Sequence, residues 1–498
     1  MLSDGNATRP HRHPARPGDR TRWPAVVVGA GPAGLATAAT LARGSVDVLV
    51  LSRHSAVSPQ PRATVLSLRT MEFLRSWGLE DRIWAGGDDV EWQMLVARTL
   101  AEAGRGHRVD VGYPTVAVSA LLSPTRPAAV PQDHLESVLL RHLLTQPTVQ
   151  VRRSVVVEQV SPDGSGWKID ARDLTTGESW TVWSDYLVGA DGPRSRVRDR
   201  LGIGLDATDD LMHAASVVFH GPLWEVVGSS RFGIYNVEIP AGGSFLPVGH
   251  GDRWVYTFGT DAEAARSGPP NSAELLARIR VAAGVPDLPV RVVAVNQFTF
   301  AAAIADHFRS GTAFLVGDAA HRVTPRGGTG LNTAIGDGVN LGWKLAWVLN
   351  GWSPTRLLDS YETERRPIAE HNIARSLDPD GSRRTAEQEL RIDLGGRLPH
   401  HWLTRPDGHP VSTLDLLTAG LTRLCDGTHP PTDDMAFTGV TAPVTDKPID
   451  HHTAVALGIS AGGNRLLRPD GVEWNAALAA PQGHHQPGTS RTANRPAA

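Results

Sequence analysis

Residues 25–42 read AVVVGAGPAGLATAATLA, and this stretch decides the fold. An apolar run leads into Gly29, Gly31 and Gly34, which have the spacing G-x-G-x-x-G, and small apolar residues follow. The order predicts a strand, a tight turn and a helix that bind the pyrophosphate of a dinucleotide. A glycine-rich turn in another kind of α/β protein is the structural alternative. The apolar run 46–51 stands where the next strand belongs, and it favours nucleotide binding.

The stretch DVLVLSRHS, residues 47–55, leaves the identity of the nucleotide open. Ser52 stands where Asp or Glu would accept hydrogen bonds from a ribose diol. A serine followed by Arg53 also suits the 2'-phosphate of NADP, because a hydroxyl and a guanidinium both bind phosphate. These residues favour FAD and NADP about equally, so other motifs must decide.

Composition narrows the class of protein. The chain has 498 residues, 41% of them hydrophobic, which is enough for two or three domains. A net charge of -3 gives no reason to expect nucleic acid or a membrane as partner. Cys425 is the only cysteine, and neither CxxC nor HExxH occurs, so we expect no disulfide, no metal and a cytoplasmic location. We expect residues 1–22 and 481–498 to be disordered tails.

Two later motifs each place an acid at the end of an apolar run. In SDYLVGADGPRSRVRDRLGI, residues 184–203, Asp191 follows a predicted strand and precedes a short basic helix. In residues 312–352, Asp318 projects from a strand tip, a glycine-rich loop follows, and a long helix begins near Gly330. Such an acid can hold sugar or ribityl hydroxyls. The free N–H groups of the first helical turn favour a ring that becomes anionic, as reduced flavin does.

The motifs GAGPAG, GADGPRSRVR and LVGDAAHRVTPRGGTGLNTAIGDGVNLGWKLA, in this order, resemble the FAD-dependent aromatic hydroxylases. These are the p-hydroxybenzoate hydroxylase-like group A flavoprotein monooxygenases, and the branch that looks closest contains the phenol and aromatic polyketide hydroxylases. The resemblance extends through residues 60–83, 130–143 and 357–372. NADP as the primary ligand thereby becomes the minor interpretation.

The resemblance implies an α/β fold in three parts. A Rossmann-like FAD-binding domain comprises residues 23–205 and 300–375. A mixed or antiparallel β-sheet domain for the substrate is inserted at residues 206–299, where alternating segments punctuated by Gly and Pro also predict strands. Residues 376–480 are expected to form a helical region and a short thioredoxin-like C-terminal module with a structural or homodimerisation role.

The resemblance also assigns residues to FAD. Arg62 and Gln132 are expected at the pyrophosphate and ribityl chain, although a surface arginine and a helix cap are the structural alternatives. Asp191 is expected to serve both FAD and the pyridine nucleotide, and His321 to be a structural partner of the loop. The full set of expected cofactor-binding residues is Gly29, Gly31, Gly34, Ser52, Arg53, Arg62, Gln132, Asp191, Asp318, Pro325, Gly330, Leu331 and Asn332.

Two positions depart from the resembled pattern. Ser52 replaces the usual Glu, which removes a charge-assisted bond to the adenosine ribose. Thr324 stands at the first position of the usual Pro-Pro pair in the loop, leaving only Pro325. The conformation of the loop and its contact with substrate therefore stay open.

The activity implied is an FAD- and NAD(P)H-dependent monooxygenase that hydroxylates a phenolic or polyketide-like aromatic through a flavin hydroperoxide. NADPH or NADH would bind transiently, because no second nucleotide motif occurs, and dioxygen is the other co-substrate. A Baeyer-Villiger or epoxidising oxygenase on the same scaffold is one alternative. A flavin-binding protein without turnover is another, and the two departures give it some weight.

No catalytic base can be assigned from the sequence. His220, Tyr235 and Tyr256 are weak candidates to orient or deprotonate a phenol. Ordinary sheet or core membership is the alternative that we prefer for each. Nearby aromatic residues, Phe232, Phe245, Trp254 and Phe258, suggest a roomy aromatic pocket for a multi-ring substrate.

Overall fold

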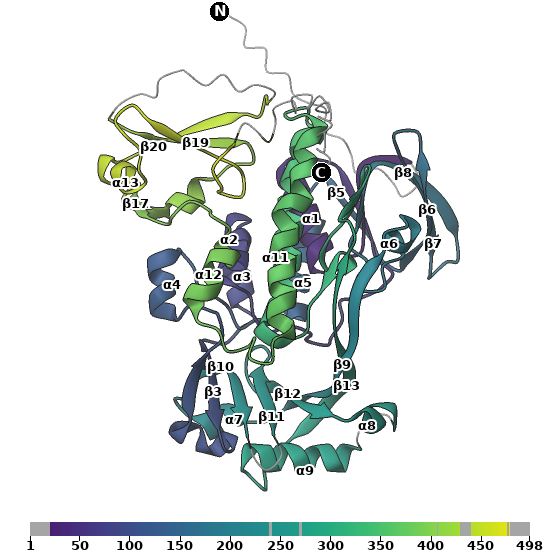
Figure 1. The fold of residues 1–498 in the computed structure, drawn as a ribbon, viewed down its shortest axis with the longest axis vertical. Helices are drawn as coiled ribbons and strands as arrows, with labels where there is room; N and C mark the ends of the chain where they lie inside the picture. Colours follow the sequence, from purple (N-terminus) through teal and green to yellow (C-terminus); the bar gives the residue numbers. More distant parts are fainter. Residues whose placement is uncertain are drawn as a thin grey trace, which may run out of the picture.

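The computed structural model describes residues 20–238, 242–267, 271–405, 407–428, 440–475 and 478. The expected tails 1–22 and 481–498 therefore lie outside the described residues, apart from residues 20–22, and Arg22 already begins the first strand. Figure 1 shows an upper part built on a parallel sheet, a lower part built on a second sheet, and a C-terminal part beside the upper one. Among the described residues, no helix is long and apolar enough to cross a membrane.

The upper sheet has the order β14-β15-β8-β1-β2-β5, and a hairpin of β6 and β7 pairs with β8. Strands β15, β8, β1, β2 and β5 run parallel to their neighbours, as in a Rossmann-like fold. The strands are β1 (Arg22–Val28), β2 (Val48–Leu51), β5 (Val149–Arg152), β6 (Val155–Asp163), β7 (Gly166–Asp173), β8 (Ser179–Gly189), β14 (Arg309–Ser310) and β15 (Ala313–Leu315).

Helix α1 (Pro32–Arg43) packs against α5 (Gln132–Leu144) and α10 (Gly330–Leu349). Glycines on α10 permit this contact. A Cβ at Gly338 would lie 2.5 Å from the carbonyl oxygen of Ala33, and one at Gly342 would lie 2.6 Å from Cβ of Thr40. The glycines of the third motif therefore bring two helices together as well as shaping the loop before α10.

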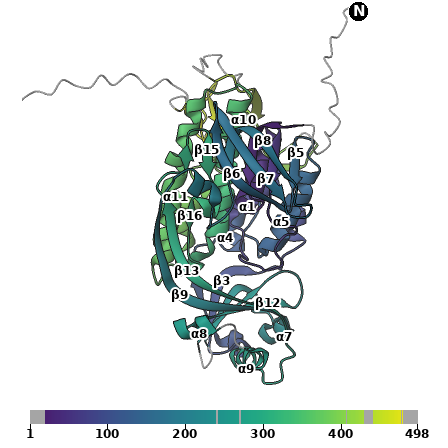
Figure 2. The same cartoon turned by 90° about the vertical axis from the view of Figure 1, so that its right-hand side faces the viewer.

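The lower sheet has the order β16-β13-β9-β12-β11-β10-β3-β4, and its neighbours are antiparallel except for the parallel pair β10 and β3. Figures 1 and 2 show its two long strands, β9 and β13, descending from the upper part. Helix α9 (Ser272–Ala283) covers the face directed away from the upper part. The strands are β3 (Glu91–Ala97), β4 (His107–Asp110), β9 (Leu205–His220), β10 (Phe232–Val237), β11 (Gly243–Pro247), β12 (Arg253–Thr260), β13 (Arg291–Ala305) and β16 (His321–Arg322).

The lower sheet includes strands from outside residues 206–299, the segment expected to form the substrate domain. Strands β3 and β4 come from the segment expected in the FAD-binding domain, and β3 pairs with β10 from Glu91↔Phe232 onward. Strand β16 also lies outside 206–299 and pairs with β13. The sheet is therefore assembled from three separate parts of the chain.

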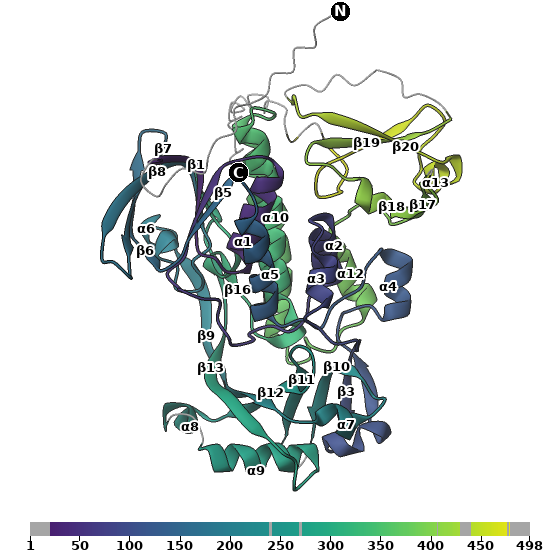
Figure 3. The same cartoon turned by 180° about the vertical axis from the view of Figure 1, so that it is seen from behind.

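The C-terminal part contains a three-stranded sheet in which β19 (Leu421–Asp426) pairs with β20 (Val444–Ile449) and β21 (Asn464–Leu467). This sheet and α13 (His451–Ala456) lie in the segment where a short thioredoxin-like module is expected. Figure 3 shows this segment beside α2 and α12. The other described α-helices and strands are α2 (Leu68–Ser76), α3 (Glu80–Trp84), α4 (Val116–Leu122), α6 (Arg196–Arg200), α7 (Leu223–Val227), α8 (Ala262–Ser267), α11 (Ser360–Leu377), α12 (Ala386–Leu394), β17 (Trp402–Thr404) and β18 (Pro410–Ser412).

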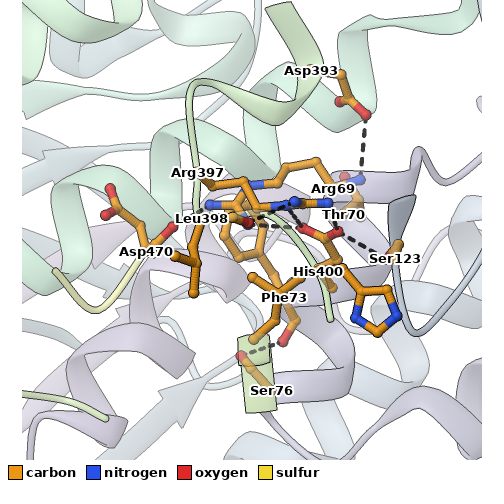
Figure 4. Close-up of polar contacts among 12 residues, drawn as sticks. Arg69, Thr70, Phe73, Ser76, Ser123, Asp393, Arg397, Leu398, His400 and Asp470 are labelled. Atoms are coloured by element: carbon orange, nitrogen blue, oxygen red, sulfur yellow. Dashed lines mark hydrogen bonds and ion pairs between the residues drawn. The ribbon is translucent and has the colours of Figure 1, made fainter. Parts of the chain in front are cut away.

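Buried ion pairs join the C-terminal part to α2. Arg397 donates to both carboxylate oxygens of Glu72 over 2.6 and 2.9 Å, and Arg69 donates to Glu72 over 2.9 Å. Ser123 donates to the same carboxylate, and Asp393 accepts from the backbone N–H of Arg69 (Figure 4). Asp393 also accepts from the hydroxyl of Ser67 over 2.8 Å. Because Glu72 and Arg397 are both buried, their separation would leave a charge without a partner, so the two parts are held in one arrangement.

Candidate active site

The register of the parallel sheet brings the predicted cofactor residues to one edge. Val28 pairs with Leu51 and with Gly189, and Gly189 pairs with Leu315. The residues that follow these strand ends are Gly29, Ser52, Asp191 and Asp318. They meet because carboxyl ends of parallel strands lie at the same edge, where nucleotide ligands bind in such folds.

The glycines of the first motif have the backbone geometry that a tight turn and a close helix–strand contact require. Gly29 has a φ of +116°, and a Cβ there would lie 2.1 Å from the carbonyl oxygen of Ala190. A Cβ at Gly34 would lie 2.0 Å from the carbonyl oxygen of Gly29, so helix and strand touch. A Cβ at Gly31 would have no atom within 4 Å. The start of α1 therefore faces open space, which fits an approaching pyrophosphate.

Asp318 lies just beyond β15, with its side chain exposed. Its carboxylate accepts no hydrogen bond from the described residues. The surrounding protein desolvates the carboxylate and raises its pKa, while the charges of His321 and Arg62 act in the opposite direction. Arg62 is thus close enough to influence Asp318, as expected if both contact one ligand. An exposed acceptor without a partner fits the hydroxyls of a ribityl chain.

The side chain of Asn332 holds two segments beside the start of α10. Its Oδ1 accepts from the backbone N–H of Ser67 over 2.8 Å, and its Nδ2 donates to the carbonyls of Val65 and Gly328, each over 3.2 Å. The amide is therefore used within the protein. The backbone N–H groups of Gly330, Leu331 and Asn332 open the helix, where no residue of that helix can accept from them. They fit the pyrimidine edge of a flavin.

Thr324 explains how the loop keeps its shape without the first proline. Its backbone N–H donates to the hydroxyl of Ser376 over 3.2 Å, and its own hydroxyl donates to the carbonyl of Ser376 over 2.8 Å. A proline offers neither donor. The sequence did not single out Tyr113, which donates to the carbonyl of Gly328 over 3.0 Å from the other side. Pro325 is exposed at the turn between these contacts.

His321 is a structural residue, as expected. Its ring lies 2.6 Å from Oδ2 of Asp337, which also accepts the backbone N–H of Gly317. Arg365 donates to Oδ1 of Asp337 over 2.8 Å. Burial raises the pKa of Asp337, but His321 and Arg365 outweigh burial and lower the pKa below its ordinary value. Asp337 thereby joins α10, α11 and the strand tip that carries Asp318.

Three other predicted residues lie at the edge with their side chains bonded inside the protein. Gln132 begins α5 and donates to Glu136 over 2.7 Å. Asp191 accepts from Ser195 and from the backbone of α6 at Arg196 over 2.7 Å, so it caps that helix. The hydroxyl of Ser52 accepts from the backbone N–H of His54 over 3.3 Å. Arg53 and Arg62 are both exposed.

Two of the candidate bases, Tyr235 and Tyr256, lie on the face of the lower sheet that α9 covers. The hydroxyl of Tyr235 donates to the carbonyl of Ser230 over 2.7 Å, and that of Tyr256 donates to the carbonyl of Gly242. Both rings are buried in a cluster that includes Leu275 and Ile279 of α9. The expected aromatic pocket is likewise wrong, because these residues belong to the same cluster: Phe232, Phe245, Trp254 and Phe258.

His220 alone among the three candidates occupies the face opposite α9. Its Nδ1 lies 2.7 Å from the carboxylate of Asp252, and this contact lowers the pKa of Asp252. The ring is therefore oriented by a surface carboxylate at the end of β9. No group of three or more His, Cys, Asp or Glu side chains in the described part of the chain is placed to hold a metal ion.

Comparison with known proteins agrees with this geometry. The family described as "FAD binding domain" matches residues 22–376. The chain belongs to this FAD-binding family. A putative polyketide hydroxylase of Streptomyces halstedii is 33% identical, over 94% of this chain and 92% of that protein. Tetracenomycin B2 monooxygenase-dioxygenase of Streptomyces olivaceus is 34% identical, over 93% of this chain and 96% of that protein.

Solved structures of FAD-binding family members have the same fold. The flavin-dependent monooxygenase PieE, in complex with FAD and substrate, superposes with a TM-score of 0.80 at 26% identity, covering 91% of this chain and 95% of that one. Aklavinone-11 hydroxylase, in complex with FAD and aklavinone, gives 0.78 at 28% identity, covering 91% and 94%. The predicted fold class, FAD as cofactor and the class of FAD-dependent monooxygenase acting on an aromatic compound are confirmed.

Proposed function

We propose that this protein hydroxylates a multi-ring, polyketide-like aromatic compound held between the start of α10 and the upper face of the lower sheet. The observation that carries the proposal is the exposed Asp318 beside the open start of α1, with the free first turn of α10 nearby. The names of the relatives, which include polyketide and tetracenomycin oxygenases, support the substrate class.

The chain's own residues have three tasks in this proposal. Gly29, Gly31 and the start of α1 receive the pyrophosphate, and Asp318 accepts hydrogen bonds from the ribityl hydroxyls. The first turn of α10 presents N–H groups and the positive end of the helix dipole to the pyrimidine edge, which stabilises negative charge there. When bound, FAD supplies the electron transfer and oxygen activation that side chains cannot provide.

The loop 324–329 and the lower sheet position the substrate and exclude water. The hydrogen bonds of Tyr113 and Thr324 hold the loop in place. The loop backbone can therefore keep a fixed position beside the aromatic ring of the substrate. With Tyr235 and Tyr256 buried on the far face, activation of a phenol rests on positioning, and His220 is the remaining candidate to hold a phenolic proton.

The decisive experiment is to reconstitute the protein with FAD and follow NADPH oxidation with and without a polycyclic phenol. We expect oxidation to be stimulated by the phenol and the product to gain one oxygen by mass spectrometry. A product in which oxygen has entered a ring as an ester, or formed an epoxide, would favour the Baeyer-Villiger or epoxidising alternative. Bound FAD that NADPH never reduces would favour a binding protein without turnover.

Several finer points belong to the same proposal. NADPH is the proposed reductant, with NADH tested beside it. The domain boundaries near residues 205, 300 and 375, a homodimer and a cytoplasmic location are further proposals. Sedimentation of the holoenzyme tests the dimer, and localisation of the tagged full-length protein tests the compartment.

A further inference from the structure

The face of the lower sheet opposite α9 carries a continuous row of short polar side chains. Strand register places Asn236 opposite Ser244, Ser244 opposite Thr257, Thr257 opposite Ser216, and Ser216 opposite Asn296. These five neighbours lie on five adjacent strands, β10, β11, β12, β9 and β13. We call them the polar row: Asn236, Ser244, Thr257, Ser216 and Asn296.

The residues two positions away along each strand form an apolar row on the same face. Leu246 pairs with Val255, Val255 with Val218, and Val218 with Ala294. Ile234 continues this row on β10. Because side chains two residues apart share a face of a strand, the polar and apolar rows run side by side. Val218 and Val255 are buried against Val248, whereas Ile234 and Leu246 are partly exposed.

Two contacts show that this face is directed toward the cofactor site. Arg253 shares its face of β12 with Thr257, and it donates to Asp133 of α5 over 2.9 Å. Phe300 shares its face of β13 with Asn296, and the guanidinium of Arg326 in the loop before α10 lies 5.9 Å from the Phe300 ring. The alternating side chains point the other way and pack against α9.

The polar row is available for a ligand. All five side chains are partly exposed, and the one hydrogen bond among them is donated by Ser244 to Asn236 over 3.1 Å. The side chains of Ser216, Thr257 and Asn296 have no hydrogen-bond partner among the described residues. With strands about 4.8 Å apart, five strands give a row about 19 Å long, far longer than a single aromatic ring.

We propose that the polar row hydrogen-bonds the oxygen-bearing edge of a flat polycyclic substrate, while Ile234 and Leu246, which are partly exposed, lie against the adjoining rings. Hydroxyl and amide side chains can donate to carbonyl oxygens and accept from phenolic hydroxyls, so they can hydrogen-bond both kinds of oxygen. The row thereby sets which edge of the substrate lies on the sheet and which carbon faces the flavin. This inference rests on the proposed function, since it places the substrate of that reaction on this sheet.

The test compares two probes with the same rings on the FAD-loaded protein. The compound 1,8-dihydroxyanthraquinone carries three oxygens on one edge, whereas 2-hydroxyanthraquinone carries one there. We expect Ser216→Ala combined with Thr257→Val to weaken binding of the first probe about tenfold and to leave the second unchanged. Thr299→Val is the matched control, because Thr299 lies on β13 on the opposite face.

Binding is followed by perturbation of the flavin absorbance, so the readout does not require turnover. Equal loss for both probes, no loss for either, or a wild-type protein that binds neither probe would overturn the polar row as the recognition element. An equal effect of Thr299→Val would do the same. A wild-type protein that binds the first probe through the row but never oxygenates a phenol would contradict the proposed function and leave the row's role in binding intact.

Discussion

The hydroxyl of Thr324 donates to the backbone carbonyl of Ser376 over 2.8 Å, and the backbone N–H of Thr324 donates to the Ser376 hydroxyl over 3.2 Å. Thr324 is 1% exposed, so both bonds are shielded from water. This pair ties the loop before α10 to the end of α11. The residue that departs from the resembled pattern is therefore an alternative way of holding the same loop.

Thr324→Val should lower the free energy of unfolding by about 1–3 kcal/mol, because a buried carbonyl loses a donor. We also expect weaker FAD binding, since the loop leads into the first turn of α10. Urea unfolding and titration with FAD measure the two effects. Thr363→Val is the control, because Thr363 is exposed on α11 and its hydroxyl contact is long at 3.4 Å. Unchanged stability and FAD affinity in Thr324→Val would show that Thr324 does not hold the loop.

Local geometry made the cofactor half of the site predictable. The turn at Gly29 needs a positive φ, and the position of Asp318 follows from a strand end, so both can be read from neighbouring residues. The lower sheet was less predictable. Strand β3 pairs with β10, which places Glu91 opposite Phe232. A local sequence pattern cannot predict a pairing between strands so far apart in sequence.

The sequence also did not predict which face of the lower sheet is buried. Alternation along a strand puts Tyr256 and Thr257 on opposite faces, but only tertiary packing decides which of these faces α9 covers. The aromatic residues of the lower sheet therefore suggested a substrate pocket, whereas in the structure they form a buried core. Tyr113 was missed for a related reason, because its hydrogen bond to Gly328 spans more than two hundred residues.

The buried carboxylate of Asp337 predicts a dependence of stability on pH. His321 and Arg365 hold its pKa below the value of about 3.9 that an unfolded aspartate has. A lowered folded-state pKa contributes stability that is present above about pH 4 and is lost as the pH falls through the folded-state value. Urea unfolding at pH 5 and pH 3 should show this loss.

Asp337→Asn should remove that part of the pH dependence and cost about 3–5 kcal/mol at pH 7, because the largely buried guanidinium of Arg365 loses its counter-charge. Asp287→Asn provides the comparison, since Asp287 is exposed between α9 and β13. If Asp337→Asn and wild type lose stability equally between pH 5 and pH 3, the buried ion pairs do not control acid unfolding.

Asp318→Ala should weaken FAD binding strongly while leaving the unfolding of the FAD-free protein nearly unchanged. The reason is that its exposed carboxylate has no partner in the described protein, so its removal costs a ligand contact and no internal bond. Titration with FAD and thermal unfolding of the FAD-free form separate the two effects. Retained FAD affinity would place Asp318 outside the site, and marked loss of apo stability would make it a structural residue.

Ser52→Glu tests which nucleotide the second strand holds. Ser52 is 4% exposed at the end of β2, and the neighbouring His54 has its pKa lowered by burial and then by Arg53, Arg62 and Arg153. Those arginines make the surroundings positive, so a carboxylate there is electrostatically favoured. It would accept the adenosine ribose hydroxyls with charge-assisted bonds worth about 1.5–3 kcal/mol, against about 1 kcal/mol for neutral ones.

We therefore expect Ser52→Glu to tighten FAD binding about tenfold and to leave the Michaelis constant for NADPH nearly unchanged at saturating FAD. Ser55→Glu is the control, because it adds the same charge at an exposed position three residues beyond Ser52. If Ser52 and Arg53 instead gripped the 2'-phosphate of NADP, the glutamate would repel it. A sharply raised Michaelis constant for NADPH with no gain for FAD would then assign DVLVLSRHS to the reductant, because only a phosphate at this strand tip is repelled by the added charge.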